Sequence, residues 1–88
     1  MATKTNKPKI KRINALWIKE EYIRDFKTMK VIGIIRIYEN GDQAAVDFDT
    51  RQVLGYYRAE LDHTTDFYGR VLTKGNVVQG LIYEKHKK

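Results

Sequence analysis

The sequence predicts a small α+β protein, mainly β, in which one N-terminal helix accompanies a curled antiparallel β-meander of about five strands. Three observations support this fold class. Residues 31–48 form two β-prone runs around a turn signal, glycines recur inside later apolar runs, and residues 14–29 carry apolar side chains at helical spacing. A chain of 88 residues has room for one domain with one small core.

The segment from Asn14 onward is predicted to be an amphipathic helix. Asparagine is a favourable N-cap residue, and apolar side chains follow it at steps of three and four. This stripe consists of Ala15, Ile18, Tyr22, Phe26 and Met29. An alternative interpretation makes residues 12–18 a strand that is followed by a shorter helix.

Residues 31–48 are predicted to form a β-hairpin around Asn40-Gly41. Asn-Gly suits the two central positions of a type I′ turn. A two-residue loop would place Ile37 opposite Ala44, Ile35 opposite Val46, and Gly33 opposite Phe48. One face of the hairpin would then be wholly apolar, with Val31, Ile35, Ile37, Ala44, Val46 and Phe48.

Three glycines, Gly33, Gly55 and Gly80, each lie within a β-prone run. We expect them to leave space for large side chains of neighbouring strands, or to mark β-bulges. The remaining strands are expected at about 52–58, 66–73 and 76–84. Their short connections favour antiparallel neighbours in the sheet.

The charge is distributed unevenly along the chain. Residues 1–30 hold nine Lys or Arg and three acidic side chains, whereas residues 31–88 hold eight of each, so the net charge of +6 belongs to the first third. We therefore expect a disordered basic arm over 1–12, a single small β-rich domain over 13–85 and a basic tail over 86–88.

The residue inventory argues against catalysis. The sequence has no serine and no cysteine, and its two histidines, His63 and His86, lie in polar surroundings. The acidic residues around His63 match no calcium-loop spacing and are typical of a solvated turn. We predict a protein that is not an enzyme, with no catalytic residues, no metal site and no cofactor.

The hydropathy pattern predicts a cytoplasmic protein without membrane contact. No apolar run approaches the roughly 18 residues that a membrane-spanning helix requires. The polar N-terminus also lacks the apolar stretch of a signal peptide.

Two functions are favoured by these features, and an enzyme, for instance a small ribonuclease that uses Lys, Arg, Tyr and His63, is a third alternative. The first is a small non-enzymatic binding module or accessory protein that acts through protein–protein contact, with another protein or further copies of itself as partner. The alternative is a nucleic-acid-binding protein, because a basic arm neutralises phosphates and sheet aromatics stack on the bases of DNA or RNA. The candidate nucleic-acid-binding residues are Lys4, Lys7, Lys9, Lys11, Arg12, Trp17, Tyr56 and Tyr57.

Two runs resemble known families. The run VLGYYRAELDHTTDFYGRVLTKGN, residues 53–76, resembles the strand repeats of small uncharacterised bacterial proteins that include the four-fold β-flower domains. That resemblance extends over residues 31–83 and implies a compact β-meander. The run TKGNVV, with Lys74, Gly75 and Asn76, is similar to a late motif of Sm-like RNA-binding proteins, which have an N-terminal helix and five curled strands. The chain lacks the earlier aspartate-and-asparagine motif of that family.

Overall fold

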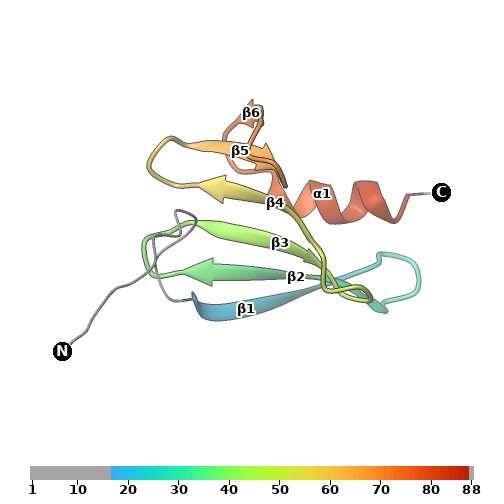
Figure 1. The fold of residues 1–88 in the computed structure, drawn as a ribbon. Helices are drawn as coiled ribbons and strands as arrows, with labels where there is room; N and C mark the ends of the chain where they lie inside the picture. Colours follow the sequence, from blue (N-terminus) through green and yellow to red (C-terminus); the bar gives the residue numbers. More distant parts are fainter. Residues whose placement is uncertain (1–16, 88) are drawn as a thin grey trace.

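The strands follow one another across a single antiparallel sheet in the order in which they occur in the chain (Figure 1). The computed structural model describes residues 17–87. Within them the sheet has six strands rather than the predicted five or so. The sequential strand order confirms the predicted antiparallel meander and the mainly β class. The elements are β1 (Trp17–Arg24), β2 (Val31–Tyr38), β3 (Gln43–Asp47), β4 (Val53–Arg58), β5 (His63–Asp66), β6 (Val71–Lys74) and α1 (Val78–Lys85).

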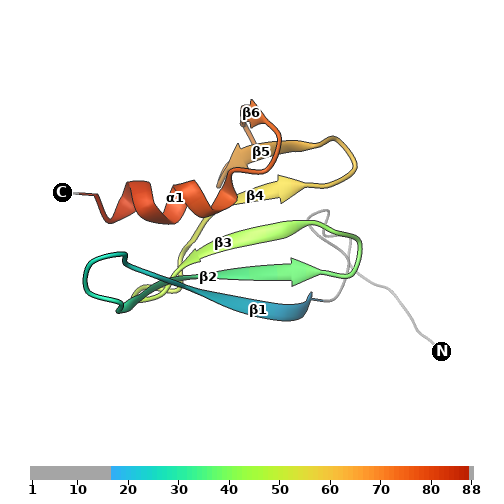
Figure 2. The same ribbon diagram turned by 180° about the vertical axis from the view of Figure 1, so that it is seen from behind.

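Helix α1 covers one face of the sheet, where it contacts β2, β3 and β4 (Figure 2). Its buried side chains Val78 and Ile82 form the core together with three strand residues, Ile23, Ile35 and Ala45. Val78 and Ile82 are four residues apart, so they lie on the same side of the helix. These five residues therefore form one layer between α1 and the middle of the sheet.

The prediction of an N-terminal helix is wrong. Residues 17–24 form strand β1, and α1 is the only helix among residues 17–87. Pairing with β2 buries Ile23, which was not part of the predicted stripe, whereas the stripe residues Ile18, Tyr22, Phe26 and Met29 are each more than half exposed. Isoleucine and aromatic residues favour strands, and sheet pairing here overrides the local helical spacing.

The hairpin between β2 and β3 exists, but its predicted register is wrong. The loop has three residues instead of two, because the Tyr38 N–H donates to the Asp42 carbonyl at 2.9 Å, and Gly41 adopts the left-handed φ of +94°. Ile35 therefore pairs with Ala45, and Ile34 pairs with Val46. Both faces of β2 carry isoleucine, so an apolar face results in either register.

The later predicted strands are correct only in part. The strand expected over 52–58 is β4, but the one expected over 66–73 is interrupted by a turn. Asp66 and Gly69 are the first and fourth residues of this turn, where the Gly69 N–H donates to the Asp66 carbonyl at 3.0 Å. The strand expected over 76–84 is wrong, since residues 78–85 form α1 and bury Val78 and Ile82 against the sheet.

A second group of buried apolar side chains lies on the face opposite α1. It consists of Ile34, Ala44 and Val46, of which none is more than 2% exposed. The register places Tyr22 opposite Ile34 and Tyr56 opposite Ala44. Both faces of the central strands thus contribute to the interior.

Candidate functional site at the open end of the sheet

Strand β6 is the last strand of the sheet, and all four of its residues are exposed. No further strand pairs with its outer side within the described residues. Val71 is 56% exposed and Leu72 is 52% exposed. The preceding turn adds two exposed rings, Phe67 and Tyr68. An unpaired strand with exposed apolar side chains is a ready template for another strand.

The opposite edge of the sheet is protected by charge. Half of the residues of β1 are charged, namely Lys19, Glu20, Glu21 and Arg24. Two of these charges pair along the strand, with Lys19 Nζ 3.5 Å from Glu21 Oε2. Strand β6 has one charged residue, Lys74. Because charged side chains discourage edge pairing, the two edges differ in their capacity to accept a partner.

The turn that leads into β6 is held by Asp66. Its carboxylate accepts hydrogen bonds from the backbone N–H groups of Tyr68 and Arg70, each at 2.9 Å, and from Arg70 Nε at 2.7 Å. Desolvation of this carboxylate raises the pKa of Asp66, but the hydrogen bonds from Arg70 lower it by more. The pKa of Asp66 therefore lies below its ordinary value. The exposed edge is therefore presented by a well-ordered turn.

The connection from β6 to α1 is anchored by a buried hydroxyl. Thr64 Oγ1 donates to the Gly75 carbonyl at 2.7 Å and accepts from the Val77 N–H at 3.0 Å. Asn76 adds a bond at the start of α1, where its Oδ1 accepts from the Val78 N–H at 3.2 Å. Both ends of β6 are consequently fixed to the rest of the domain.

Three nitrogen-bearing side chains lie next to one another on β4, β5 and β6, on the face of the sheet opposite α1. Arg58 of β4 pairs with His63 of β5, and His63 pairs with Lys74 of β6. Directly paired residues of antiparallel strands point to the same face. We call Arg58, His63 and Lys74 the basic row.

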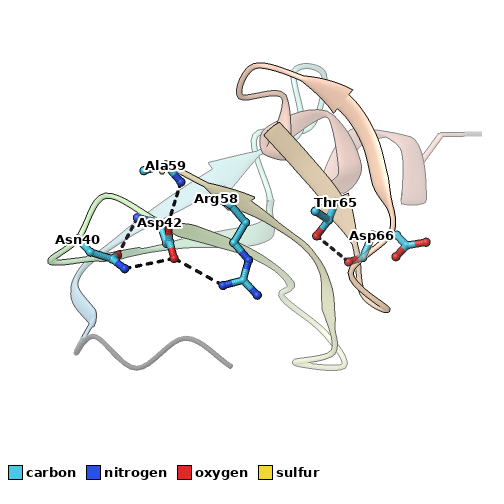
Figure 3. A network of polar contacts seen from close by, with 6 residues as sticks. All are labelled: Asn40, Asp42, Arg58, Ala59, Thr65 and Asp66. Carbon is cyan, nitrogen blue, oxygen red and sulfur yellow. Dashed lines mark hydrogen bonds and ion pairs between the residues drawn. The ribbon is translucent and has the colours of Figure 1, made fainter. Parts of the chain in front are cut away.

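Arg58 is positioned by an aromatic ring and a carboxylate. Its guanidinium carbon lies 5.1 Å from the centre of the Tyr56 ring, and its Nη1 lies 3.6 Å from Asp42 Oδ2. Asp42 has further donors, since it accepts from the Ala59 N–H at 2.8 Å and from Asn40 Nδ2 at 3.3 Å (Figure 3). The Arg58–Asp42 contact is thus the longest of three contacts to this carboxylate.

The surface has two hollows, one next to the basic row and one at the C-terminal end of α1. A pocket of about 360 Å³ adjoins the basic row and is lined by Arg58, Glu60, Leu61, His63, Thr65 and Gly69. A groove of about 540 Å³ lies at the far end of α1, where the Phe26 and Tyr83 rings stack at 5.0 Å. The charged groups that line the groove have both signs: Asp25, Lys27, Glu84, His86 and Lys87. The groove shows no preference for an anion or a cation.

The candidate nucleic-acid-binding residues are only partly placed. Lys4, Lys7, Lys9, Lys11 and Arg12 lie outside the described residues, and Trp17 begins β1 with its side chain outside the described part. Tyr56 lies beneath Arg58, whereas Tyr57 packs against the core next to α1 and donates to Asp62 Oδ1 at 2.7 Å. The two adjacent tyrosines therefore do not form one stacking surface.

Sequence reasoning missed the basic row. Its members are separated by five and eleven positions, and only the strand register brings them together. The second histidine, His86, lies at the other end of the domain with its Nε2 2.8 Å from Asp47 Oδ1.

Neither a cluster of metal-ligating side chains nor a membrane-spanning helix is present in residues 17–87. Among residues 17–87 no group of three or more His, Asp or Glu side chains is arranged to hold a metal ion. The helix in the same range is too short and too polar to cross a bilayer.

No family model, curated protein or solved structure matches this chain. The resemblances to the β-flower repeats and to the Sm-like proteins therefore stay predictions. What the protein does must be inferred from its own surfaces.

Proposed function

We propose that this protein is a non-enzymatic binding module of the cytoplasm that acts through protein–protein contact at β6. The observation that supports this is an unpaired edge strand with Val71 and Leu72 exposed, held at both ends by Asp66 and Thr64. An extended segment of a partner would add to this edge as a seventh strand. In this mode backbone hydrogen bonds supply affinity, and the side chains on either face supply selectivity.

The size of the edge predicts a transient contact. Val71 and Leu72 are already about half buried, so covering the remainder contributes roughly 1–3 kcal/mol in total. Ordering and immobilising two molecules costs more than this. The Phe67 and Tyr68 rings beside the edge supply further apolar area that a partner can cover. We expect micromolar binding rather than a permanent complex.

A photo-crosslinking amino acid at position 72 tests the proposal in cells. The matched control carries the same group at Lys19, on the charged edge β1. We expect a discrete crosslinked protein from position 72 that is absent from position 19. The added substitution Val71→Lys should abolish the crosslink, because a charged side chain at the edge opposes strand addition.

The identity of the crosslinked species distinguishes the partners. Mass spectrometry separates another protein from a second copy of this chain, and sedimentation of the pure protein measures self-association directly. Equal crosslinking from positions 72 and 19, or a position-72 product that persists in the Val71→Lys variant, would rule out β6 as the contact.

Nucleic-acid binding is the second candidate function. The observation that favours it is the position of the Tyr56 ring beside Arg58. The ring lies on the face opposite α1 with Arg58 over it, a combination that stacks on bases in other proteins. Titration with single-stranded DNA and RNA at two salt concentrations tests it, together with deletion of residues 1–12. Steep salt dependence that the deletion removes would assign binding to the arm.

A further inference from the structure

We infer that the basic row of Arg58, His63 and Lys74 is a binding site for a phosphate group. The three residues occupy paired positions on β4, β5 and β6. Neighbouring strands are about 4.8 Å apart, so the row extends over about 10 Å. This inference is independent of the protein contact proposed at the outer edge of β6.

The donors of the row are largely unused. Within residues 17–87 neither the His63 ring nor the Lys74 ammonium forms a hydrogen bond or an ion pair, and the Arg58 guanidinium forms an ion pair but no hydrogen bond. Basic side chains directly opposite one another destabilise a sheet when they are charged. An anion bound between them offsets that repulsion and supplies the missing acceptors.

Arg58 is free to turn toward a ligand without stranding a buried charge. Its partner Asp42 is 10% exposed, and this carboxylate keeps the Ala59 N–H and the Asn40 amide as donors. The centre of the Tyr56 ring lies 5.1 Å from the guanidinium carbon, on the same face of the sheet. A planar guanidinium is well suited to binding two phosphate oxygens at once.

The adjoining pocket has the size and polarity for such a ligand. Its volume of about 360 Å³ exceeds that of one phosphate group, and Arg58, His63 and Thr65 are among its lining residues. Glu60 also lines it and Lys74 does not, so an anion is favoured on the side of the pocket where Arg58 and His63 lie, next to Lys74 on the neighbouring strand. A phosphate satisfies these donors better than a carboxylate, because its tetrahedral oxygens accept from several directions.

Two-dimensional ¹H–¹⁵N NMR of the full chain tests the site with four probes. The probes are inorganic phosphate, a single-stranded DNA oligonucleotide, the matching RNA, and sodium acetate at equal ionic strength. We expect phosphate-bearing probes to shift the amide signals of residues 58, 63 and 74, and acetate to leave them in place. Shifts with inorganic phosphate alone indicate a small phosphorylated ligand, and shifts with an oligonucleotide alone indicate a phosphodiester backbone.

Substitutions locate the binding. We expect His63→Gln and Lys74→Gln each to weaken phosphate binding about tenfold, since each removes one charge-assisted contact. Lys19→Gln makes the same charge change as Lys74→Gln, but on β1, and should leave the affinity unchanged. Neither His63 nor Lys74 is buried, so unchanged signals elsewhere will show that the variants are folded.

The inference is overturned by any of three results. The first is the absence of shifts at residues 58, 63 and 74 with every phosphate-bearing probe. The second is an equal response to acetate. The third is a loss of affinity in His63→Gln and Lys74→Gln no greater than in Lys19→Gln, which would show an effect of net charge only.

Discussion

The side chain of Ile82 occupies the space that a side chain at Gly33 would need. A Cβ atom at residue 33 would lie 2.5 Å from both Cδ1 and Cγ2 of Ile82. At Gly55 a Cβ atom would collide with the backbone carbonyl of Thr65 on β5 and would lie 2.5 Å from Leu81 Cδ1. Two consecutive residues of α1 thus fill the space above two strand glycines, which lets the helix approach the sheet closely.

Gly33→Ala should lower the free energy of unfolding by about 1–3 kcal/mol, because it overpacks the core against Ile82. Equilibrium unfolding in urea measures this change. In an Ile82→Ala background the same substitution should cost less, since the clashing atoms are gone. An identical cost in both backgrounds would show that Ile82 is not what restricts residue 33.

Gly80→Ala should have the opposite effect and raise the free energy of unfolding by about 0.5–1 kcal/mol. Gly80 lies inside α1, and a Cβ atom there would meet nothing within 4 Å. Alanine lowers the conformational entropy of the unfolded chain and favours the helix. The same urea experiment applies, and a destabilised variant would mean that the groove beside Gly80 needs the space.

The sheet could be predicted because its signals are local. The Asn40-Gly41 turn and the β-branched run from Val31 identify a hairpin without knowledge of the rest of the fold. The expectation that strand glycines leave room for large side chains fits Gly33 and Gly55, but the side chains that fill the space come from α1 rather than from aromatic rings, and the Thr65 backbone also lies against Gly55. The expectation is wrong for Gly80, which lies in α1 with nothing within 4 Å of an added Cβ atom. Which element covers a strand glycine is a tertiary property.

Two predicted elements, the helix that begins at Asn14 and the strand over 76–84, are wrong for related reasons. Residues 18–29 have a helical spacing of apolar side chains, yet β2 offers an edge that buries Ile23 when β1 is a strand. Residues 78–82 have strand-like composition, yet a helix places Val78, Leu81 and Ile82 together against the sheet. In both cases packing overrides short-range preference.

The basic row could not be predicted from the sequence, because a pairing between Arg58, His63 and Lys74 depends on two loop lengths and one register shift in β5–β6. The exposed edge of β6 had a better signal. Val71 and Leu72 are adjacent, so a strand there must present an apolar side chain on each face.

Thr64→Val should lower the free energy of unfolding by about 1–3 kcal/mol. The Thr64 hydroxyl is fully buried and serves both the Gly75 carbonyl and the Val77 N–H, which valine would leave without partners. Its cross-strand neighbour Thr73 is exposed, so Thr73→Val provides the matched control and should change the stability by less than about 0.5 kcal/mol. Similar losses in both variants would mean that the hydroxyl bonds of Thr64 contribute little.

Asp47→Asn should make the stability less dependent on pH in the acid range. Burial raises the pKa of Asp47, but hydrogen bonds from the Thr50 N–H and from the His86 ring lower it by more. The pKa of Asp47 therefore lies below its ordinary value of 3.8. A carboxylate with a lowered pKa in the folded state stabilises the protein above its unfolded-state pKa, and this contribution is lost as the pH falls through the folded-state pKa.

Urea unfolding at a series of pH values should therefore show a wild type that is about 1–3 kcal/mol more stable than the Asp47→Asn variant near neutrality, with the difference shrinking below about pH 4. The other carboxylates with lowered pKa values, Asp25 and Asp66, are present in both proteins and cancel in the comparison. A difference that stays constant from neutral to acid pH would show that the charge of Asp47 does not hold the end of α1 against the sheet.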